Sequence, residues 1–535
     1  MSPLEVSKNW TILQAGFIFQ EKRKGRTDAV RYFWTMKKGK MILFGVTAPI
    51  LLVMAFPSSG HAEADTISLS MTDVIRMAQE SSPQARQAKV SFESAWYSYR
   101  SYKAEYLPSL SLSSNPSLNR STSSVTLPDG SEKYVRSNSF HSGLNLDLTQ
   151  NIWFTGGSIS LSGSLSRLDQ FGDSHTHSYY SQPLQLSISQ DLSGYNRFKW
   201  ERKTEPLSYR IARKEYAETL ELVASQAASL FFGLVAAQTN LDIARINYAE
   251  ADTLYTYGKG RYGIGTITEN ELLQLELRLL SEETGIISSE MAMQDAVDAL
   301  RNYLNLPSDV DIRVRTDDSI PLFTIPLDRA MELARQNSPD MDYMELNRLS
   351  SESNLAYYKS QAGFRASIYM RLGLAQTAED LPESLRNLND EQSVSVSVSI
   401  PILDWGRNRG RVRVAQNNLE MTRMRNEQSM VSFEKTVTRA VTQFNSQQRQ
   451  VDIARRTMLT AQHRYDVARH MYMSGNSTML DLNEAITAKD SAYRLYTSAL
   501  SQYWQLYYTI RSMTGFDFDR NVSIEHDVES MMKKL

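Results

Sequence analysis

The sequence predicts a mixed α+β, mainly α fold with an internal duplication, in which long antiparallel coiled-coil helices adjoin strands of a membrane β-barrel that is shared between protomers. Three observations predict it: helical stretches with a heptad repeat, stretches in which apolar and polar residues alternate, and a duplication of the whole order of elements. Heptad repeats wind helices around one another. Strict alternation gives a sheet one apolar face and one polar face.

Composition excludes several classes of protein. The 535 residues include 58 Lys and Arg against 60 Asp and Glu, so the net charge of −2 offers no general field for nucleic acid. A mean hydropathy of −0.40 argues against a polytopic helical membrane protein. The chain has no Cys, which excludes disulfides, thiolate catalysis and lipid attachment to a cysteine in these residues.

The N-terminal region resembles a secretory signal. Residues 36–40 are basic, Met41–Phe56 is apolar and uncharged, and small residues follow up to Ala64. This order is typical of a signal peptide over residues 36–64. An uncleaved anchor is the alternative, and residues 1–35 are predicted to be an atypical leader, with translation starting at Met36 as one reading. A cleaved signal places the protein beyond the inner membrane of a bacterium.

The chain repeats itself. Met71–Pro83 resembles Leu327–Pro339, and Arg261–Thr268 resembles Met471–Thr478. We expect a first repeat over 65–306, with strands within 107–192 and a helical hairpin over 197–304. A linker over 307–326 leads to a second repeat over 327–516, with strands within 366–403 and a hairpin over 406–514, and a tail over 517–535.

Heptad spacing marks the long helices. In the second repeat the apolar positions follow 3-4-3-4 steps: Val451, Ala454, Met458, Ala461, Tyr465, Ala468 and Tyr472. The stretch from Arg407 to Ser474 contains only Gly410 as a helix breaker. At 1.5 Å per residue such a helix is about 100 Å long, which suits a rod rather than a compact globule.

Alternating segments predict the strands. Six candidates are 107–118, 138–154, 157–168, 182–192, 366–376 and 393–403. Aromatic residues flank them, in the manner of a membrane-interface girdle: Trp153, Phe154, Phe171, Tyr179, Tyr180 and Trp405. A soluble sandwich with one buried face is the alternative. Since one chain has too few strands to close a barrel, we expect an oligomer in which each copy contributes strands.

Together these features resemble the TolC-like outer-membrane factor family over about residues 65–515. The carriers are the duplicated Ser-Pro helix starts, Leu107-Pro108 before a strand, the segment Ile400–Gly406 after one, and the twin Tyr/Gly helix tips. The resemblance implies a homotrimer of the TolC-like fold in the bacterial outer membrane. Its shared β-barrel would cross that membrane, and its long helices would form an α-helical barrel that extends through the periplasm. It implies passive export, with substrate loaded by a periplasmic adaptor and an inner-membrane transporter.

The strand count departs from the family pattern. The resemblance implies four strands per chain and twelve per barrel, whereas this sequence has six candidate strands. The additional hairpin, residues 138–168, either widens the barrel or folds as an outer loop. The sequence leaves both open.

The helix tips carry the candidate gate. Asp481 and Glu484 are three residues apart and share a helix face, so a trimer would gather six carboxylates. Helix capping by Asp481 is the plainer reading. By resemblance, Asp481 and Glu484 align with an acidic ring that narrows the periplasmic entrance, and Tyr472 and Glu271 align with a latch between tip helices. Ser477 stands where the family carries an Arg that strengthens this latch.

The tip turns are also the expected adaptor contact; simple exposure of a loop is the alternative. Gly265 and Gly475 are expected to permit the chain reversal, and Asn476, Ser477 and Thr478 to cap the following helix. The predicted contact comprises Gly265, Thr266, Ile267, Thr268, Gly475, Asn476, Ser477 and Thr478.

No catalytic, cofactor or metal site is predicted. The seven His residues are scattered, and His175 and His177 are expected in a polar loop without further ligands. Phosphate-binding and nucleophile motifs are absent from the sequence. The competing functions are a non-transporting periplasmic coiled-coil scaffold or stalk and, less favoured, an enzyme. The cargo and the class of pump are left open.

Overall fold

The computed structural model describes residues 66–524, apart from 172–174, 309, 316–319, 322 and 475. All of them belong to one unit, Ala62–Leu535. The predicted leader (1–35), the predicted signal peptide (36–64) and residues 525–535 of the predicted tail lie outside the described residues.

Two sets of helices follow each other in the same order. The first set is α1 (Met71–Ser81), α2 (Pro83–Ala104), α3 (Arg197–Gly263) and α4 (Glu269–Leu304). The second is α5 (Leu327–Asn337), α6 (Pro339–Ala362), α8 (Arg407–Met473) and α9 (Met479–Thr514). Helices α3 and α8 each have 67 residues, and α4 and α9 each have 36. The mainly α fold and its internal duplication are confirmed.

The duplicated Ser-Pro dipeptides begin helices. Ser82 accepts a hydrogen bond from the backbone N–H of Ala85, and Pro83 occupies the first turn of α2. Ser338 accepts from Asp340 in the same way, ahead of Pro339. A serine oxygen satisfies an N–H that has no partner in the helix, and proline fits the first turn because its missing N–H is not needed there.

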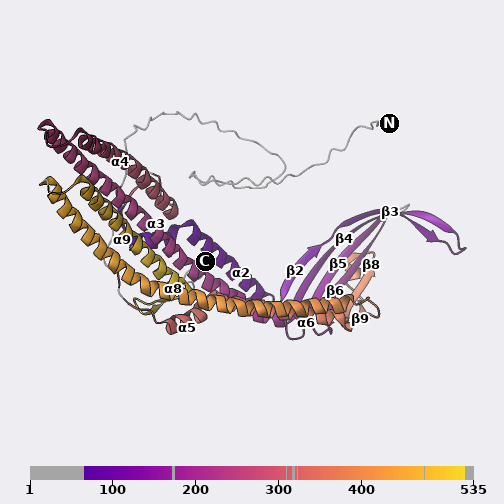
Figure 1. Cartoon of the computed structure of the whole chain (residues 1–535). Helices are drawn as coiled ribbons and strands as arrows, with labels where there is room; N and C mark the ends of the chain where they lie inside the picture. Colours follow the sequence, from indigo (N-terminus) through magenta and orange to yellow (C-terminus); the bar gives the residue numbers. More distant parts are fainter. Residues whose placement is uncertain are drawn as a thin grey trace, which may run out of the picture. The chain divides into compact units, whose positions relative to one another are not determined.

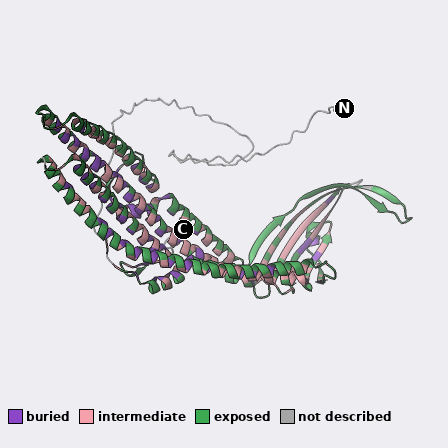
Figure 2. Ribbon diagram, in the orientation of Figure 1, coloured by how far each residue is buried: buried purple, intermediate pink, exposed green. Residues whose placement is uncertain are grey.

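The helices pack along apolar seams (Figure 1). Helix α3 packs against α2, α4, α6 and α9, and α8 packs against α6 and α9. Figure 2 shows the buried residues as stripes along these helices. Small residues such as Ala224, Ala227 and Ala228 let the helix axes approach, and the rings of Phe231, Phe444 and Tyr503 fill the core. Helix α3 contains an 18-residue window of mean hydropathy 1.6, of which 56% is buried, so we interpret it as a core helix.

The strands form one antiparallel sheet of seven strands in the described part of the chain. They are β2 (Ser109–Ser114), β3 (Ser117–Thr126), β4 (Glu132–Ile152), β5 (Gly157–Phe171), β6 (His175–Asp191), β8 (Arg365–Ala378) and β9 (Asn389–Ser399). The order is β2-β4-β5-β6-β8-β9, with β3 also paired to β4. Strands β2 and β3 pair with different halves of β4, so the sheet is six strands wide. The short helix α7 (Leu381–Ser384) lies in the β8–β9 connection.

The bounds of three predicted strands were wrong. Residues 107–118 do not form one strand, because Asn115 and Pro116 separate β2 from β3; proline has no N–H to donate to a ladder. The predicted strand 393–403 ends at Ser399, two residues before Pro401. His175 and His177 were expected in a loop, but both lie in β6, which begins seven residues before its predicted start at 182.

Two small sheets lie apart from the large one in the described residues. Strand β1 (Thr66–Ser70) pairs in parallel with β7 (Asp311–Arg315), so the stretch predicted as a linker contains a strand. Strands β10 (Phe516–Asp517) and β11 (Val522–Ser523) form a hairpin directly after α9. The start of the predicted tail is therefore folded back, not extended.

Candidate gate at the helix tips

The two long hairpins end in equivalent turns. Residues 264–268 join α3 to α4, and residues 474–478 join α8 to α9. Gly265 has a φ of +70°, a conformation that favours glycine, and its N–H donates to the carbonyl of Tyr262. In the second tip, Asn476 donates its backbone N–H to Met471 at 2.9 Å. Gly475 lies outside the described residues.

Each tip ends in a capping box. The Thr268 hydroxyl accepts from the N–H of Glu271 at 3.3 Å, and the Glu271 carboxylate accepts from the N–H of Thr268 at 2.8 Å. Thr478 and Asp481 make the same reciprocal pair at 3.2 and 3.1 Å. Two predicted gate residues, Glu271 and Asp481, thus occupy equivalent positions and cap α4 and α9.

Hydrogen bonds keep Asp481 ionised. Its carboxylate accepts from the hydroxyls of Thr478 at 2.6 Å and Ser477 at 3.1 Å. Chiefly because of the Thr478 hydroxyl, then the Thr478 N–H and the Ser477 hydroxyl, the pKa of Asp481 lies below its usual range. Capping and a negative charge at the entrance are therefore compatible roles for this residue.

The structure places Glu484 beside Asp481 on the exposed side of α9. Leu482, Ala485 and Ile486 face the other way and are buried. Glu484 also forms an ion pair with Arg464 of α8 at 2.8 Å, a partner that the sequence analysis did not identify. Together Asp481, Glu484 and Arg464 leave one net negative charge on this face of a chain.

Tyr472 is half-buried against an apolar cluster between the hairpins. The cluster contains Leu254, Leu275, Tyr465, Leu482, Ala485 and Ile486. Burial raises the pKa of the Tyr472 phenol, and the charges of Arg261 and Glu271 act on it as well. Within the described residues, the hydrogen bonds of the Glu271 carboxylate run to Thr268, not to Tyr472. The latch between these two residues stays a prediction.

The tip turns are exposed. Gly265, Thr266, Thr268, Asn476 and Thr478 are exposed, whereas Ile267 and Ser477 are half-buried. Two apolar side chains next to them, Ile264 and Leu480, are each 76% exposed. Isolated apolar side chains on a surface are common, but here an exposed apolar side chain lies beside each of the two tip turns.

A buried polar cluster lies between the hairpins, and sequence reasoning missed it. Lys489 of α9 is 5% exposed. Its Nζ lies 3.5 Å from the side-chain oxygen (Oδ1) of Asn247 in α3 and 4.2 Å from the centre of the Tyr465 ring in α8. The Asn247 amide donates to Asp490 at 2.9 Å. The sequence contained a signal for this cluster, since Lys489 lies three residues after Ile486 and therefore on the buried side of α9.

Carboxylates surround this lysine. Burial raises the pKa of Glu282 on α4, where Arg278 opposes the effect and the charge of Asp490 adds to it. Burial also raises the pKa of Tyr465, next to Glu250 on α3. The cluster therefore brings together polar groups of all four long helices where water screens their charges only in part.

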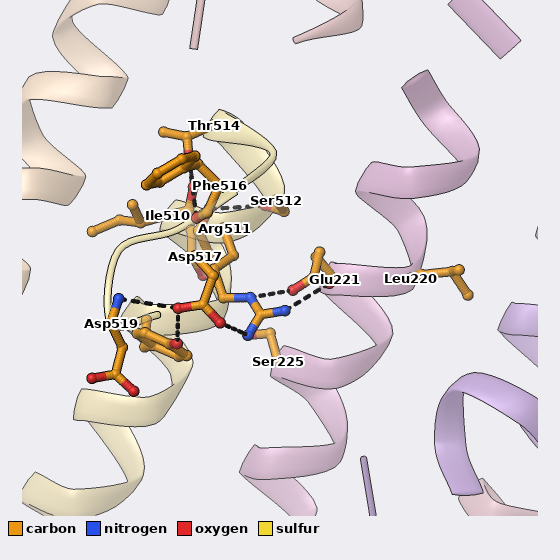
Figure 3. A network of polar contacts seen from close by, with 12 residues as sticks. Leu220, Glu221, Ser225, Ile510, Arg511, Ser512, Thr514, Phe516, Asp517 and Asp519 are labelled. Carbon is orange, nitrogen blue, oxygen red and sulfur yellow. Dashed lines mark hydrogen bonds and ion pairs between the residues drawn. The ribbon is translucent and has the colours of Figure 1, made fainter. Parts of the chain in front are cut away.

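A second buried network holds the end of α9 (Figure 3). Arg511 pairs with Glu221 of α3 at 2.8 Å and with Asp517 at 3.0 Å. Tyr507 donates its hydroxyl to Asp517 at 2.7 Å, and the N–H of Asp519 donates to the same carboxylate at 3.0 Å. This network fixes the β10–β11 segment against the first hairpin.

The described residues contain no group of three or more His, Cys, Asp or Glu side chains that could hold a metal ion. The described residues of the tips provide charge, helix caps and apolar surface.

Comparison with known proteins gives one family. A family model described as outer membrane efflux protein matches residues 157–306 and 330–516. The cation efflux system protein CusC of Escherichia coli O157:H7 is 24% identical over 340 residues, which are 62% of this chain and 70% of that protein. The probable outer membrane lipoprotein SilC of Salmonella typhimurium is 22% identical over 318 residues, 59% of this chain and 67% of that protein.

Solved structures agree. The Campylobacter jejuni CmeC outer membrane channel has a TM-score of 0.62 at 16% identity, with 87% of this chain and 88% of that chain covered. The outer-membrane channel OprN has a TM-score of 0.61 at 16% identity, with 83% and 89% covered. The resemblance drawn from the sequence is confirmed. Because the matched segments make up more than half of its residues, the chain belongs to the outer membrane efflux protein family.

Proposed function

We propose that three copies of this chain form the exit duct of a tripartite efflux or secretion system. The duct passively exports small molecules or polypeptides that a periplasmic adaptor and an inner-membrane transporter deliver. The single observation that carries this proposal is the sheet, which has one apolar and one polar face and continues directly into the 67-residue helices α3 and α8. Membership in the efflux family supports it and disfavours the scaffold alternative.

The sheet cannot close by itself. In the described part of the chain its outermost strands are β9 on one side and β2 with β3 on the other. A free edge exposes N–H and C=O groups that lipid cannot satisfy. Further copies of the chain would complete the ladder, as the proposed trimer does.

The periplasmic gate of this duct would lie at the tips. Asp481 and Glu484 project from the same exposed face, so three copies would gather six carboxylates, opposed by three Arg464 side chains. Such a ring attracts cations, traps multivalent ones and repels itself unless it is neutralised. Tyr472 and Glu271 are the proposed latch between neighbouring tip helices.

The tips would also meet the adaptor. The contact consists of the two exposed turns with Ile264 and Leu480 beside them. Helix ends that meet end-on bury little area, so this docking is of modest affinity. Exchanging both apolar side chains for Ser should reduce co-purification of the adaptor and leave the conductance of the isolated duct unchanged.

Single-channel recording tests the duct and its gate. We expect an Asp481→Ala/Glu484→Ala variant to conduct more than the wild type and to lose block by divalent cations. The charge-matched control is Glu420→Ala/Glu427→Ala, which removes two exposed carboxylates of α8 far from the tips. Absence of any conductance step in the wild type and the gate variant would contradict the duct. Unchanged block would remove Asp481 and Glu484 from the gate.

A further inference from the structure

The additional hairpin lies inside the sheet. Strands β4 and β5 stand between β2 and β6, and their ladder runs from Ser139–Gln170 to Ile152–Gly157. The hairpin therefore separates the two strands that leave and re-enter the helices, α2 to β2 and β6 to α3. It is part of the sheet along most of its length.

The register continues one apolar row across the sheet. Residues directly opposite in antiparallel strands share a face. One such row runs through five strands: Leu110, Leu148, Leu161, Leu186 and Leu372. A second row holds Ile159, Ile188, Met370 and Val394. Each row meets one glutamine, Gln392 of β9 in the first and Gln150 of β4 in the second. The hairpin carries the same apolar face as the strands from both repeats.

A polar row crosses the opposite face in six of the strands. It consists of Ser109, Thr149, Ser160, Ser187, Arg371 and Ser393. A loop in water has no reason to keep such alternation in register with its neighbours, whereas a wall between lipid and water requires it. Leu110, Leu148, Leu161 and Leu372 are 39–67% exposed in the single chain, so they need an apolar covering.

We propose that each protomer contributes six strand positions, so that three protomers close a barrel of 18 strands in which β9 of one copy pairs with β2 and β3 of the next. This inference rests on the proposed trimeric duct. With strands about 4.8 Å apart and tilted by about 40°, 18 strands enclose a backbone diameter of about 36 Å, against about 24 Å for twelve.

The helices that join the sheet fit the larger width. In each protomer four helices adjoin the sheet: the chain enters the sheet from α2 and α6 and leaves it into α3 and α8. Twelve helices with axes about 10 Å apart enclose a circle of about 38 Å diameter. An 18-stranded barrel therefore has nearly the same diameter as the helical barrel. The β-barrel then does not exclude by size any cargo that has passed the helix tips. The export of polypeptides and other bulky cargo is the function that such a mouth suits.

Fluorescence quenching tests the position of the hairpin. The sequence has no cysteine, so single cysteines can be labelled with bimane without background. The outward probes on the hairpin are Leu146→Cys and Leu161→Cys, and the inward probes are Asp147→Cys and Ser160→Cys. Leu372→Cys and Val394→Cys are outward references outside the hairpin. Folding is checked for every variant by recovery of the intact oligomer from bilayers.

We expect doxyl-labelled lipid to quench the outward hairpin probes as strongly as the references, and aqueous iodide to quench only the inward probes. Outward hairpin probes that respond only to iodide, beside lipid-quenched references, would overturn the 18-stranded barrel and leave the duct intact. References that lipid fails to quench would overturn the duct itself. Projection images of the oligomer in bilayers supply the direct count: 18 strands support the proposal, and twelve refute it.

Discussion

The two long hairpins, α3–α4 and α8–α9, are the same scaffold with different side chains at a few positions. Their helices have equal lengths, and every position in the first corresponds to the one 210 residues later, as Arg197 does to Arg407 and Glu269 to Met479. Both start their second helix with a Thr-capped box. Duplication has therefore preserved length and capping, the features that set where the tips lie.

Charge distinguishes the hairpins. Arg464, Glu484, Lys489 and Asp490 in the second correspond to Leu254, Gln274, Leu279 and Leu280 in the first. The second hairpin thus carries the ion pair at the tip and the buried lysine, while the first has uncharged residues at these four positions and contributes Asn247 and the carboxylate of Glu282 to the cluster. The comparison teaches that a few substitutions in one copy can place charges on a scaffold whose length and capping both copies share.

The largest loss of stability is expected at an arginine that is paired with buried carboxylates in the second hairpin only. Replacing Arg511 by Met removes the guanidinium between Glu221 and Asp517, which are 2% and 3% exposed. We expect the free energy of unfolding to fall by about 3–5 kcal/mol, because two buried carboxylates lose their cation. Denaturant unfolding in detergent measures it.

The matched control is Arg301→Met, at the equivalent position of α4. Arg301 donates to the carbonyl of Val310 and pairs with Asp298, whose side chain is 46% exposed. We expect a loss of about 1–2 kcal/mol there. Equal losses at both positions would show that burial does not distinguish them.

The next effect concerns Lys489. Lys489→Leu installs the residue found at Leu279 and leaves Asp490 without its neighbouring cation. We expect a loss of about 3 kcal/mol. The double variant Lys489→Leu/Asp490→Leu reproduces the first hairpin and should recover part of that loss, since an apolar pair can replace a buried ion pair. A double variant less stable than the single one would contradict the comparison.

A smaller effect depends on pH. Burial, and then the charges of Asp340 and Glu215, raise the pKa of Glu218 in α3 from 4.5 to about 7. The folded state binds the proton more tightly, so stability conferred by the protonated form is complete below pH 4.5 and falls as the pH rises towards 7.

The equivalent residue in α8 is Gln428, so Glu218→Gln makes the hairpins alike. At pH 8 we expect the variant to be more stable than the wild type by about 1 kcal/mol, a value that allows for partial solvent screening, and to equal it near pH 4. Unfolding measured from pH 4 to 8 gives both curves. Parallel curves would show that Glu218 does not titrate in this range.

The smallest loss of stability is expected from changes at the helix caps, and it should be the same in both hairpins. Thr268→Ala and Thr478→Ala each remove a cap hydroxyl that accepts from the third helical N–H. Each should lower stability by about 1 kcal/mol. Hydrogen exchange at the start of α4 and α9 locates the change. A cost at one tip only would mean that the capping boxes are not equivalent.

Local patterns account for what the sequence predicted well. The extent of α8 follows from its heptad steps and from the lack of helix breakers other than Gly410 between Arg407 and Ser474, because burial along a helix repeats within a few residues. The strand β5 follows from alternation and the turn before Gly157. The division between β2 and β3 was harder to predict, since the alternating pattern continues on both sides of Pro116.

By itself the sequence determined the duplication, the long helices, the two-faced strands and Asp481 and Glu484 as neighbours on one helix face. Only the tertiary structure decided that Arg464 pairs with Glu484, that Lys489 is buried beside Asn247, and that β4 and β5 stand inside the sheet. The physical reason is range: periodic burial is encoded within a segment, whereas Asn247 and Lys489 are 242 residues apart and meet only because two hairpins pack together.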